Sequence, residues 1–372
     1  MWYKLKSEIS VFIPIYKESD ILEPLLERLL NELYDEKEIF VIIDEPTERS
    51  IDLSSRMKGD VRFILNGERL GKVNALNRAV KQSIGEILLF LDSDIVIPNS
   101  SFLEAVSVEM ETSEILEIKK NVLRDSFMSK ITSYEFLSFN YAFWLFSHFL
   151  NRGLGVHGAA FAIRRDTFQS LGGFRSVVAE DLDLGTRSFL NDIKFKYAYN
   201  IEVQNRVPST WKAWFEQRKR WGLGVALWVR EYYRELGGSF RKHPEILIPS
   251  LFILFPSIIV FLMNAMIPNH IYLKLLSIIL LFISTKQIFL LSPILLTSVG
   301  LTLIKSFVTV FCGFAVYAII FYFFARKLNY TYNLLEFLVF YFIYNPLWFL
   351  FVITSIIGLM IWPSKMDIDW KI

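Results

Sequence analysis

The chain has 372 residues, with 40 Lys and Arg against 38 Asp and Glu, so its formal net charge is +2. A net charge this close to zero gives no indication of nucleic-acid binding. The single cysteine, Cys312, excludes an intrachain disulfide. The length allows one large domain or two ordinary ones.

Charged residues are unevenly distributed along the chain. Beyond Glu245 there are seven Lys or Arg and three acidic residues. A helix that crosses a bilayer needs about 20 mostly apolar residues. Residues 246–267 and 334–362 meet this length, and 307–325 comes close. Residues 271–304 fit one long helix, two short ones, or an interfacial segment with a span. We expect four crossings, with three or five as alternatives.

Strands and helices alternate in the first part of the chain. Apolar runs predict strands at residues 9–15, 39–43, 61–65 and 87–91. Asp20, with Glu23 three residues later, is a candidate cap for the helix after the first strand. Short apolar strands separated by helices indicate an α/β fold with a mostly parallel, Rossmann-like sheet.

The pattern changes after residue 100. Residues 127–150 form a long aromatic segment, and residues 153–164 resemble a glycine-rich loop that leads into a strand. Residues 180–191 predict a helix with acidic residues in its first turn. Residues 209–236 predict a long helix that mixes Trp with Arg, as interfacial amphipathic helices do.

Polar and acidic residues follow three of the predicted strands. They are Pro14, Tyr16 and Glu18 after the first, Asp44 and Glu45 after the second, and Asp92 and Asp94 after the fourth. Ligands of open α/β sheets bind beyond the carboxyl ends of the strands. Carboxylates spaced like Asp92 and Asp94 can hold a divalent cation, which would neutralise a diphosphate. The same short string also suits a turn or a helix cap.

Six strings occur in order along the chain. They are FIPIYKE (12–18), VIIDEP (41–46), RLGKVNALN (69–77), LFLDSDIVIP (89–98), AEDLDLGTR (179–187) and QRKRW (217–221). As a set they resemble the family 2 inverting glycosyltransferases, in particular the membrane-integrated branch with cellulose, chitin and hyaluronan synthases and glucosylceramide synthase. The resemblance covers most of residues 12–221.

The resemblance implies a GT-A fold, a nucleotide-sugar donor, a Mg²⁺ or Mn²⁺ ion and a cytoplasmic catalytic domain in an integral protein of the cell membrane. Because QRKRW enzymes mostly use UDP-sugars, it favours a UDP-sugar here. The expected layout is a catalytic domain (1–208), an interfacial helical region with QRKRW (209–244), transmembrane helices (245–363) and a tail (364–372).

The resemblance also implies roles for the donor residues. Asp44 would bind the nucleobase, in a pocket lined by the backbone near Pro14 and Tyr16, and Glu18 is a further candidate for donor binding. Asp92 and Asp94 would bind the donor's ribose and diphosphate through the metal, with Asp94 the more direct ligand.

Asp181 would be the catalytic base, with Glu180 beside it. From the residues alone, both acids could equally cap a helix, whose N-terminus favours negative charge. Lys72 is a candidate nucleotide contact next to the tight turn at Gly71, or a solvated lysine at a helix start. His157 lies where the family has acceptor-site residues, although a lone His is more often structural.

Gln217, Arg220 and Trp221 would hold the diphosphate and frame the acceptor site. Their spacing places them on one helical face. Arg presents a planar fork to phosphate oxygens, and Trp a flat apolar face to a sugar ring. Alternatively, Trp221 belongs to the core and Arg220 contacts lipid headgroups.

The chain departs from the family pattern in places. Lys17 stands where Asn is common, Pro46 where Gly often follows the acids, and Ala179 where Thr is usual. We find no gating-loop motif after Trp221. We therefore expect the acceptor to be either a lipid-linked molecule or a growing glycan at the bilayer. The sequence predicts no particular oligomeric state.

Two other activities are compatible with the sequence. A polyprenyl-phosphate sugar synthase, with a UDP- or GDP-sugar donor, would share the early strings but usually lacks QRKRW. A membrane transporter or receptor could use the first domain to sense nucleotides, but the scarcity of charged residues in the apolar segments argues against an ion pathway.

Overall fold

The computed structural model describes residues 7–256, 258, 262 and 298–361. The chain divides into two compact units, Met1–Ser250 with Leu350–Ile372, and Leu251–Phe349. The expected division of the chain at residues 208, 244 and 363 stays a prediction.

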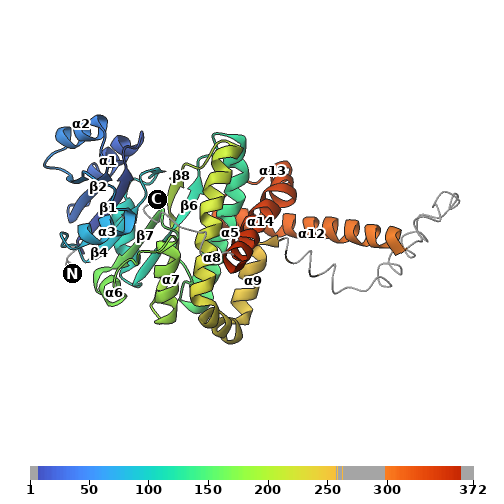
Figure 1. Ribbon diagram of the computed structural model, residues 1–372. Helices are drawn as coiled ribbons and strands as arrows, with labels where there is room; N and C mark the ends of the chain where they lie inside the picture. Colours follow the sequence, from blue (N-terminus) through green and yellow to red (C-terminus); the bar gives the residue numbers. More distant parts are fainter. Residues whose placement is uncertain (1–6, 257, 259–261, 263–297, 362–372) are drawn as a thin grey trace. The chain divides into compact units, whose positions relative to one another are not determined.

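The first unit is built on one mixed sheet of eight strands (Figure 1). The strands are β1 (Ile9–Tyr16), β2 (Lys37–Asp44), β3 (Arg62–Asn66), β4 (Ile87–Leu91), β5 (Ile95–Val96), β6 (Ile115–Val122), β7 (Ala160–Arg164) and β8 (Phe195–Asn205). Their order in the sheet is β3-β2-β1-β4-β7-β6-β8-β5. Strands β3, β2, β1 and β4 pair in parallel, whereas β7 is antiparallel to β4 and β6.

Helices lie between these strands along the chain and also follow the last of them. They are α1 (Leu22–Leu30), α2 (Glu48–Arg56), α3 (Lys72–Val80), α4 (Phe102–Met110), α5 (Phe127–Leu150), α6 (Arg165–Ser170), α7 (Glu180–Leu190), α8 (Trp211–Lys242) and α9 (Pro244–Leu254). The predicted α/β fold is confirmed, and the expected parallel pairing holds throughout the β3-β2-β1-β4 part of the mixed sheet.

Alternating side chains give the sheet two apolar faces. Val11, Val41 and Leu89 lie in one buried cluster with residues of α1 and α4. On the other face, neighbouring strands stack a row of phenylalanines, with Phe12 and Phe90 at 5.2 Å between ring centroids. Because apolar side chains cover both faces of the sheet, polar side chains reach solvent mainly at the ends of the strands.

Some local predictions are wrong. Asp20 does not cap α1, because the helix starts at Leu22 without a side-chain cap and Asp20 pairs with Arg49 at 2.6 Å. Strands β5, β6 and β8 and helices α2, α4 and α6 are not among the predicted elements. Strand β6 was not predicted because Glu117, Lys119 and Lys120 interrupt its apolar pattern, although all three are buried.

Helices α7 and α8 are joined by polar contacts. Asp183 is buried and accepts a hydrogen bond of 2.7 Å from the Tyr232 hydroxyl, and the Trp228 indole N–H donates to the Thr186 hydroxyl at 2.8 Å. The helix that begins at Glu180 is therefore held by the helix that carries QRKRW.

The second unit contains α12 (Ser298–Leu328), α13 (Leu334–Val339), a five-residue π-helix (Phe340–Tyr344) and the start of α14 (Asn345–Ile361). Within this unit, Tyr317 donates a hydrogen bond of 3.0 Å to the Phe252 carbonyl, and Asn345 one of 3.0 Å to the Leu254 carbonyl.

In the described part of the chain, two helical stretches are long and apolar enough to cross a membrane, judged by length and composition. They are Lys305–Leu328 and Leu334–Ile361, which coincide with two of the expected spans. Residues 257, 259–261 and 263–297 lie outside the described residues, and with them most of the other expected spans. The number of crossings stays a prediction.

Candidate active site

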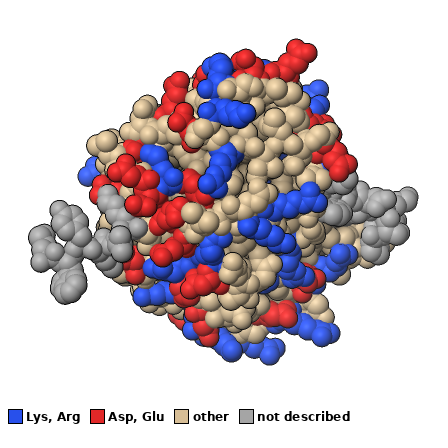
Figure 2. Space-filling view, turned by 90° about the vertical axis from the view of Figure 1, so that its left-hand side faces the viewer, with Lys and Arg blue, Asp and Glu red and all other residues tan. Residues whose placement is uncertain are grey.

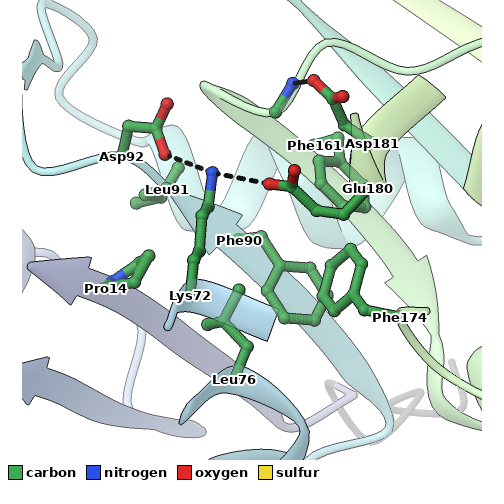
Figure 3. A pocket seen from close by; sticks show the side chains of 11 residues that line it. Pro14, Lys72, Leu76, Phe90, Leu91, Asp92, Phe161, Phe174, Glu180 and Asp181 are labelled. Carbon is green, nitrogen blue, oxygen red and sulfur yellow. Dashed lines mark hydrogen bonds and ion pairs between the residues drawn. The ribbon is translucent and has the colours of Figure 1, made fainter. Parts of the chain in front are cut away.

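A pocket opens at the carboxyl ends of β1 and β4 (Figure 3). Its lining residues are Pro14, Lys72, Leu76, Phe90, Leu91, Asp92, Gly158, Phe161, Phe174, Glu180 and Asp181. Five of the predicted site residues are thus brought together from elements far apart in the sequence. The pocket has an aromatic side formed by Phe90, Phe161 and Phe174 and a polar side that carries three carboxylates and one ammonium group.

Lys72 lies between two of the pocket carboxylates. Its Nζ is 3.0 Å from Oδ1 of Asp92 and 3.1 Å from Oε1 of Glu180 (Figure 3). Burial alone would lower the pKa of Lys72, but the charges of Asp92, Glu180 and Asp181 outweigh it and raise the pKa. Lys72 is therefore a charged group that links β4 to the start of α7.

Asp44 is buried at the end of β2 and is held by two donors. The backbone N–H of Gly71 donates to Oδ2 at 2.8 Å, and the Asn66 amide donates to Oδ1 at 2.8 Å. Gly71 has a positive φ of 82°, a backbone conformation that glycine adopts without strain. This turn places Lys72 at the start of α3, as the sequence suggested.

Tyr16 and Glu18 extend the edge beyond β1. The Tyr16 hydroxyl donates to Oε2 of Glu45 at 2.9 Å, and the Arg69 guanidinium lies 4.4 Å from the Tyr16 ring centroid. Glu18 accepts a hydrogen bond of 2.6 Å from the Thr47 hydroxyl. These contacts tie the ends of β1 and β2 to the segment before α3.

Asp92 and Asp94 are the two acids that could hold a cation. Although the Asp94 side chain reaches solvent, the surrounding protein strips part of its hydration shell, and this effect together with the Asp92 charge raises the pKa of Asp94 to about 7. A divalent cation relieves this kind of crowding between carboxylates, so the pair fits a metal. Among the described residues, no group of three or more His, Cys, Asp and Glu side chains is arranged as a metal site.

Asp181 is anchored by backbone donors. The N–H of Gly158 donates to Oδ2 at 2.8 Å, and the N–H of Leu182 donates to Oδ1 at 2.7 Å. Burial, and then the charge of Glu180, raise the pKa of Asp181 to about 6, while Lys72 and the backbone donors act in the opposite direction. An acid with this pKa is ionised near neutral pH and remains a competent proton acceptor.

His157 is held from the strand side of the pocket. Its backbone N–H donates to Oε2 of Glu117 at 3.0 Å, and Glu117 also pairs with Lys120. Burial and the charges of Lys120, Lys72 and Arg218 lower the pKa of His157, so the imidazole is neutral. Glu117 and Lys120 were not among the site residues predicted from the sequence. The feature that could have indicated them is a pair of charged residues within an otherwise apolar strand.

The QRKRW string lies on α8. Arg218 is fully buried, Gln217 and Trp221 are half-buried, and Arg220 is exposed. The structure places Gln217 and Trp221 around Arg218, whereas the sequence had grouped them with Arg220. His157 meets the Trp221 ring edge-on, at 6.2 Å between ring centroids.

The surface charges are mixed. On the face shown in Figure 2, Lys and Arg side chains are interspersed with Asp and Glu, and the coloured residues form no extended region of one sign. The arrangement agrees with the net charge of +2.

Comparison with known proteins shows which family this region resembles. Residues 10–169 match the family model described as Glycosyl transferase family 2. This part of the chain is therefore similar to a family 2 glycosyl transferase domain. The match covers the strands and helices that supply Asp44, Lys72, Asp92 and Asp94.

Curated relatives are similar over a larger part of the chain. The chain is 24% identical to the "Probable glycosyltransferase YdaM" of Bacillus subtilis over 293 residues, which are 71% of this chain and 66% of that protein. It is 24% identical to the "Poly-beta-1,6-N-acetyl-D-glucosamine synthase" of Staphylococcus epidermidis over 222 residues, which are 58% of this chain and 54% of that protein. The chain thus spans about half to two thirds of the length of these relatives.

A solved structure shares the fold. The mannosyltransferase PcManGT from Pyrobaculum calidifontis, solved in complex with GDP-Man and Mn²⁺, matches 82% of this chain and 86% of its own, with a TM-score of 0.50 and 19% sequence identity. The GT-A-like architecture expected from the sequence is confirmed at the level of the fold.

Proposed function

We propose that this chain is a metal-dependent inverting glycosyltransferase that moves a sugar from a nucleotide-sugar, a UDP-sugar, to a lipid-linked or growing glycan acceptor at a membrane. The observation that carries the proposal is the pocket in which Lys72 bridges Asp92 and Glu180 while Gly158 holds Asp181. Donor-binding charges and a candidate base thus line one cavity at the ligand edge of the sheet.

The donor half consists of Asp44, Lys72 and the Asp92–Asp94 pair. Buried Asp44 is suited to accept hydrogen bonds from a nucleobase, and Lys72 can move its ammonium group toward phosphate oxygens. Asp92 and Asp94 would hold Mg²⁺ or Mn²⁺, which when bound supplies positive charge to the leaving diphosphate. The Mn²⁺ and GDP-Man found with the mannosyltransferase of the same fold support this assignment.

The transfer is a single displacement. The acceptor hydroxyl oxygen attacks the anomeric carbon of the donor sugar, and the bond from that carbon to the diphosphate oxygen breaks. The bonding electron pair leaves with the nucleoside diphosphate, and the hydroxyl proton passes to Asp181. Because the pKa of Asp181 is about 6, far below that of an alcohol, the proton moves as the new bond forms.

The proposed location of the acceptor at a membrane rests on the apolar helices in the C-terminal part of the chain. The helices Lys305–Leu328 and Leu334–Ile361 have the length and composition to cross a bilayer. Catalysis by the first unit would then face the cytoplasm in an integral protein of the cell membrane. The polysaccharide synthase among the relatives supports a glycan acceptor.

The test uses the full chain purified in detergent. Release of nucleoside diphosphate is measured with UDP-glucose, UDP-N-acetylglucosamine, UDP-glucuronate and GDP-mannose, with Mn²⁺ or with EDTA, and with or without membrane lipid extract. One UDP-sugar should be turned over, only with metal, and Asp181→Asn should slow transfer at least about 100-fold, the usual contribution of a general base.

The control is Lys219→Ala, an exposed position on α8, which should behave as wild type. Turnover that is unaffected by EDTA would refute the metal, and full transfer by Asp181→Asn would refute the base. Transfer to added polyprenyl phosphate by that same variant would indicate the phosphate-acceptor alternative.

A further inference from the structure

Arg218 differs from the other cations of the QRKRW string by its burial. It is fully buried, whereas Lys219 and Arg220 are exposed. Burying a guanidinium group is costly unless the surrounding protein supplies charge and hydrogen bonds. The contacts that compensate for the burial of Arg218 therefore indicate its role.

The Arg218 guanidinium contacts a carboxylate, an amide and two indole rings, of which the Trp214 ring centroid lies 5.6 Å from the guanidinium carbon. Nη2 donates to Oε2 of Glu135, a buried residue of α5, and Nη1 donates to Oε1 of Gln217 at 2.7 Å. The guanidinium carbon lies 4.1 Å from the centroid of the Trp221 ring. Only a planar fork can pair with a carboxylate, bond a neighbouring amide and lie over an aromatic ring at the same time.

The contact with Gln217 fixes which way its amide points. An amide has one acceptor oxygen and one NH₂ group that carries two donors. Because the oxygen accepts from Arg218, the NH₂ group of Gln217 is directed away from Arg218. A donor group suits an anionic oxygen, whereas the flipped amide would present a carbonyl oxygen that repels one.

The contact with Trp221 fixes the orientation of its ring. The guanidinium lies over the indole, a favourable position for a cation, and His157 meets the ring edge-on, with an angle of 83° between the planes. The half-buried ring is thus held by α5, through Glu135 and Arg218, and by the loop before β7.

We infer that Arg218, paired with Glu135, is a positioning residue that turns the Gln217 amide into a hydrogen-bond donor for the diphosphate and fixes the Trp221 ring beside it. This inference rests on the proposed function, because it takes the ligand of Gln217 to be a nucleoside diphosphate. It assigns a role to a buried ion pair behind the site, formed by residues that need not touch the ligand.

The test measures the Kd of UDP with Mn²⁺ by calorimetry, together with the Tm of each detergent-solubilised full-length variant. Gln217→Glu is the sharpest variant, because its carboxylate keeps a bond to Arg218 but has no proton to donate. It should retain the Tm of wild type and bind UDP at least about tenfold more weakly, as expected for a lost hydrogen bond to a charged group.

Arg218→Lys keeps the charge but loses the fork, and it should weaken UDP binding by a similar factor. Glu135→Gln keeps an oxygen for Arg218 and should have a smaller effect. Val106→Ala, a fully buried site under the sheet, is the stability control: it should lower the Tm and leave the Kd of UDP within twofold of wild type. Lys219→Ala should change neither quantity.

The outcomes separate this inference from the proposed function. If Asp92→Asn and Asp94→Asn abolish UDP binding while Gln217→Glu and Arg218→Lys bind as wild type, the role of Arg218 is refuted and the proposed function stands. If wild type shows no metal-dependent UDP binding, the proposed function itself fails. If Val106→Ala weakened UDP binding as much as Arg218→Lys does for the same loss of Tm, the positioning role would also be overturned. If Arg218→Lys does not fold, Gln217→Glu decides.

Discussion

The backbone N–H of Gly158 donates a hydrogen bond of 2.8 Å to Oδ2 of Asp181. The residue before it, His157, donates its own N–H to Glu117. Two consecutive amides of one loop therefore hold two carboxylates, one from α7 and one from β6. The position of Asp181 depends on a loop whose backbone must pass very close to it.

A side chain at residue 158 should therefore disturb the candidate base. A Cβ added to Gly158 would lie 2.9 Å from Oδ2 of Asp181, a distance that real Cβ contacts do not reach. We expect Gly158→Ala to lower kcat by about 100-fold, because displacements of about 1 Å have effects of this size. The measurement is nucleoside diphosphate release at saturating donor.

The matched control is Gly237→Ala on α8, where an added Cβ meets nothing within 4 Å. This variant should keep the kcat of wild type. A Gly158→Ala enzyme with unchanged kcat would show that the loop does not position Asp181.

The raised pKa of Asp181 predicts a pH dependence of transfer. Burial, and then Glu180, raise this pKa to about 6, and the base must be ionised to accept a proton. We expect kcat/KM to fall as the pH decreases through about 6, by about tenfold per pH unit below it. Glu180→Gln removes a charge that raises the pKa, so the acid limb should move to lower pH. An acid limb that stays in place would show that another group controls it.

The same shift predicts how stability depends on pH. In the unfolded chain the pKa of an aspartate is near 3.8, below the folded value of Asp181. The folded state therefore binds the proton more tightly and loses stability as the pH rises from about 4 to above 6. The Tm of Asp181→Asn relative to wild type should increase over this range. A difference in Tm that is constant with pH would contradict the assigned pKa.

The position of the candidate donor residues was predictable from the sequence because it follows a general rule of α/β sheets. Asp44 and Asp92 come directly after apolar strands, and parallel strands bring their carboxyl ends to one edge. The approach of α7 to this edge did not follow from strand patterns. The position of α7 near the site was expected only because AEDLDLGTR resembles a string of a known family.

The buried ion pairs are the part of the structure that could not be predicted from the sequence. Nothing in the sequence indicates that Lys120 and Arg218 are buried, since charged side chains are rarely buried unless paired. Their partners, Glu117 three residues away on a strand and Glu135 on a distant helix, became evident only once the chain was folded. The prediction that groups Arg220 with Gln217 and Trp221 used helical spacing alone, and spacing cannot tell which of two neighbouring arginines points inward.

Lys72 should matter for donor affinity. Its Nζ contacts Asp92 and Glu180, and it is the described lysine that lines the pocket. Lys72→Met should weaken the binding of UDP with Mn²⁺ at least about tenfold, because a charged hydrogen-bond donor is lost. Lys81→Met, an exposed residue just after the same helix, is the control and should bind as wild type. Equal affinities of the two variants would remove Lys72 from the donor site.

The pair of Glu117 and Lys120 allows its structural and functional effects to be separated. Both residues are buried, and the charge of Lys120 partly offsets the burial that raises the pKa of Glu117 to about 7. Glu117→Leu removes the carboxylate that pairs with Lys120, and breaking a buried pair in this way costs about 3–5 kcal/mol. Adding Lys120→Met makes the site apolar and should recover most of the lost Tm.

Activity should not recover with stability, because the leucine cannot accept the His157 N–H that Glu117 holds at 3.0 Å. We expect the double variant to have a Tm near that of wild type and a reduced kcat, with the loop before Gly158 released on the β6 side. The measurement is nucleoside diphosphate release alongside thermal unfolding. If kcat returned together with the Tm, Glu117 would serve folding alone, and the loop would be positioned by Asp181 without its help.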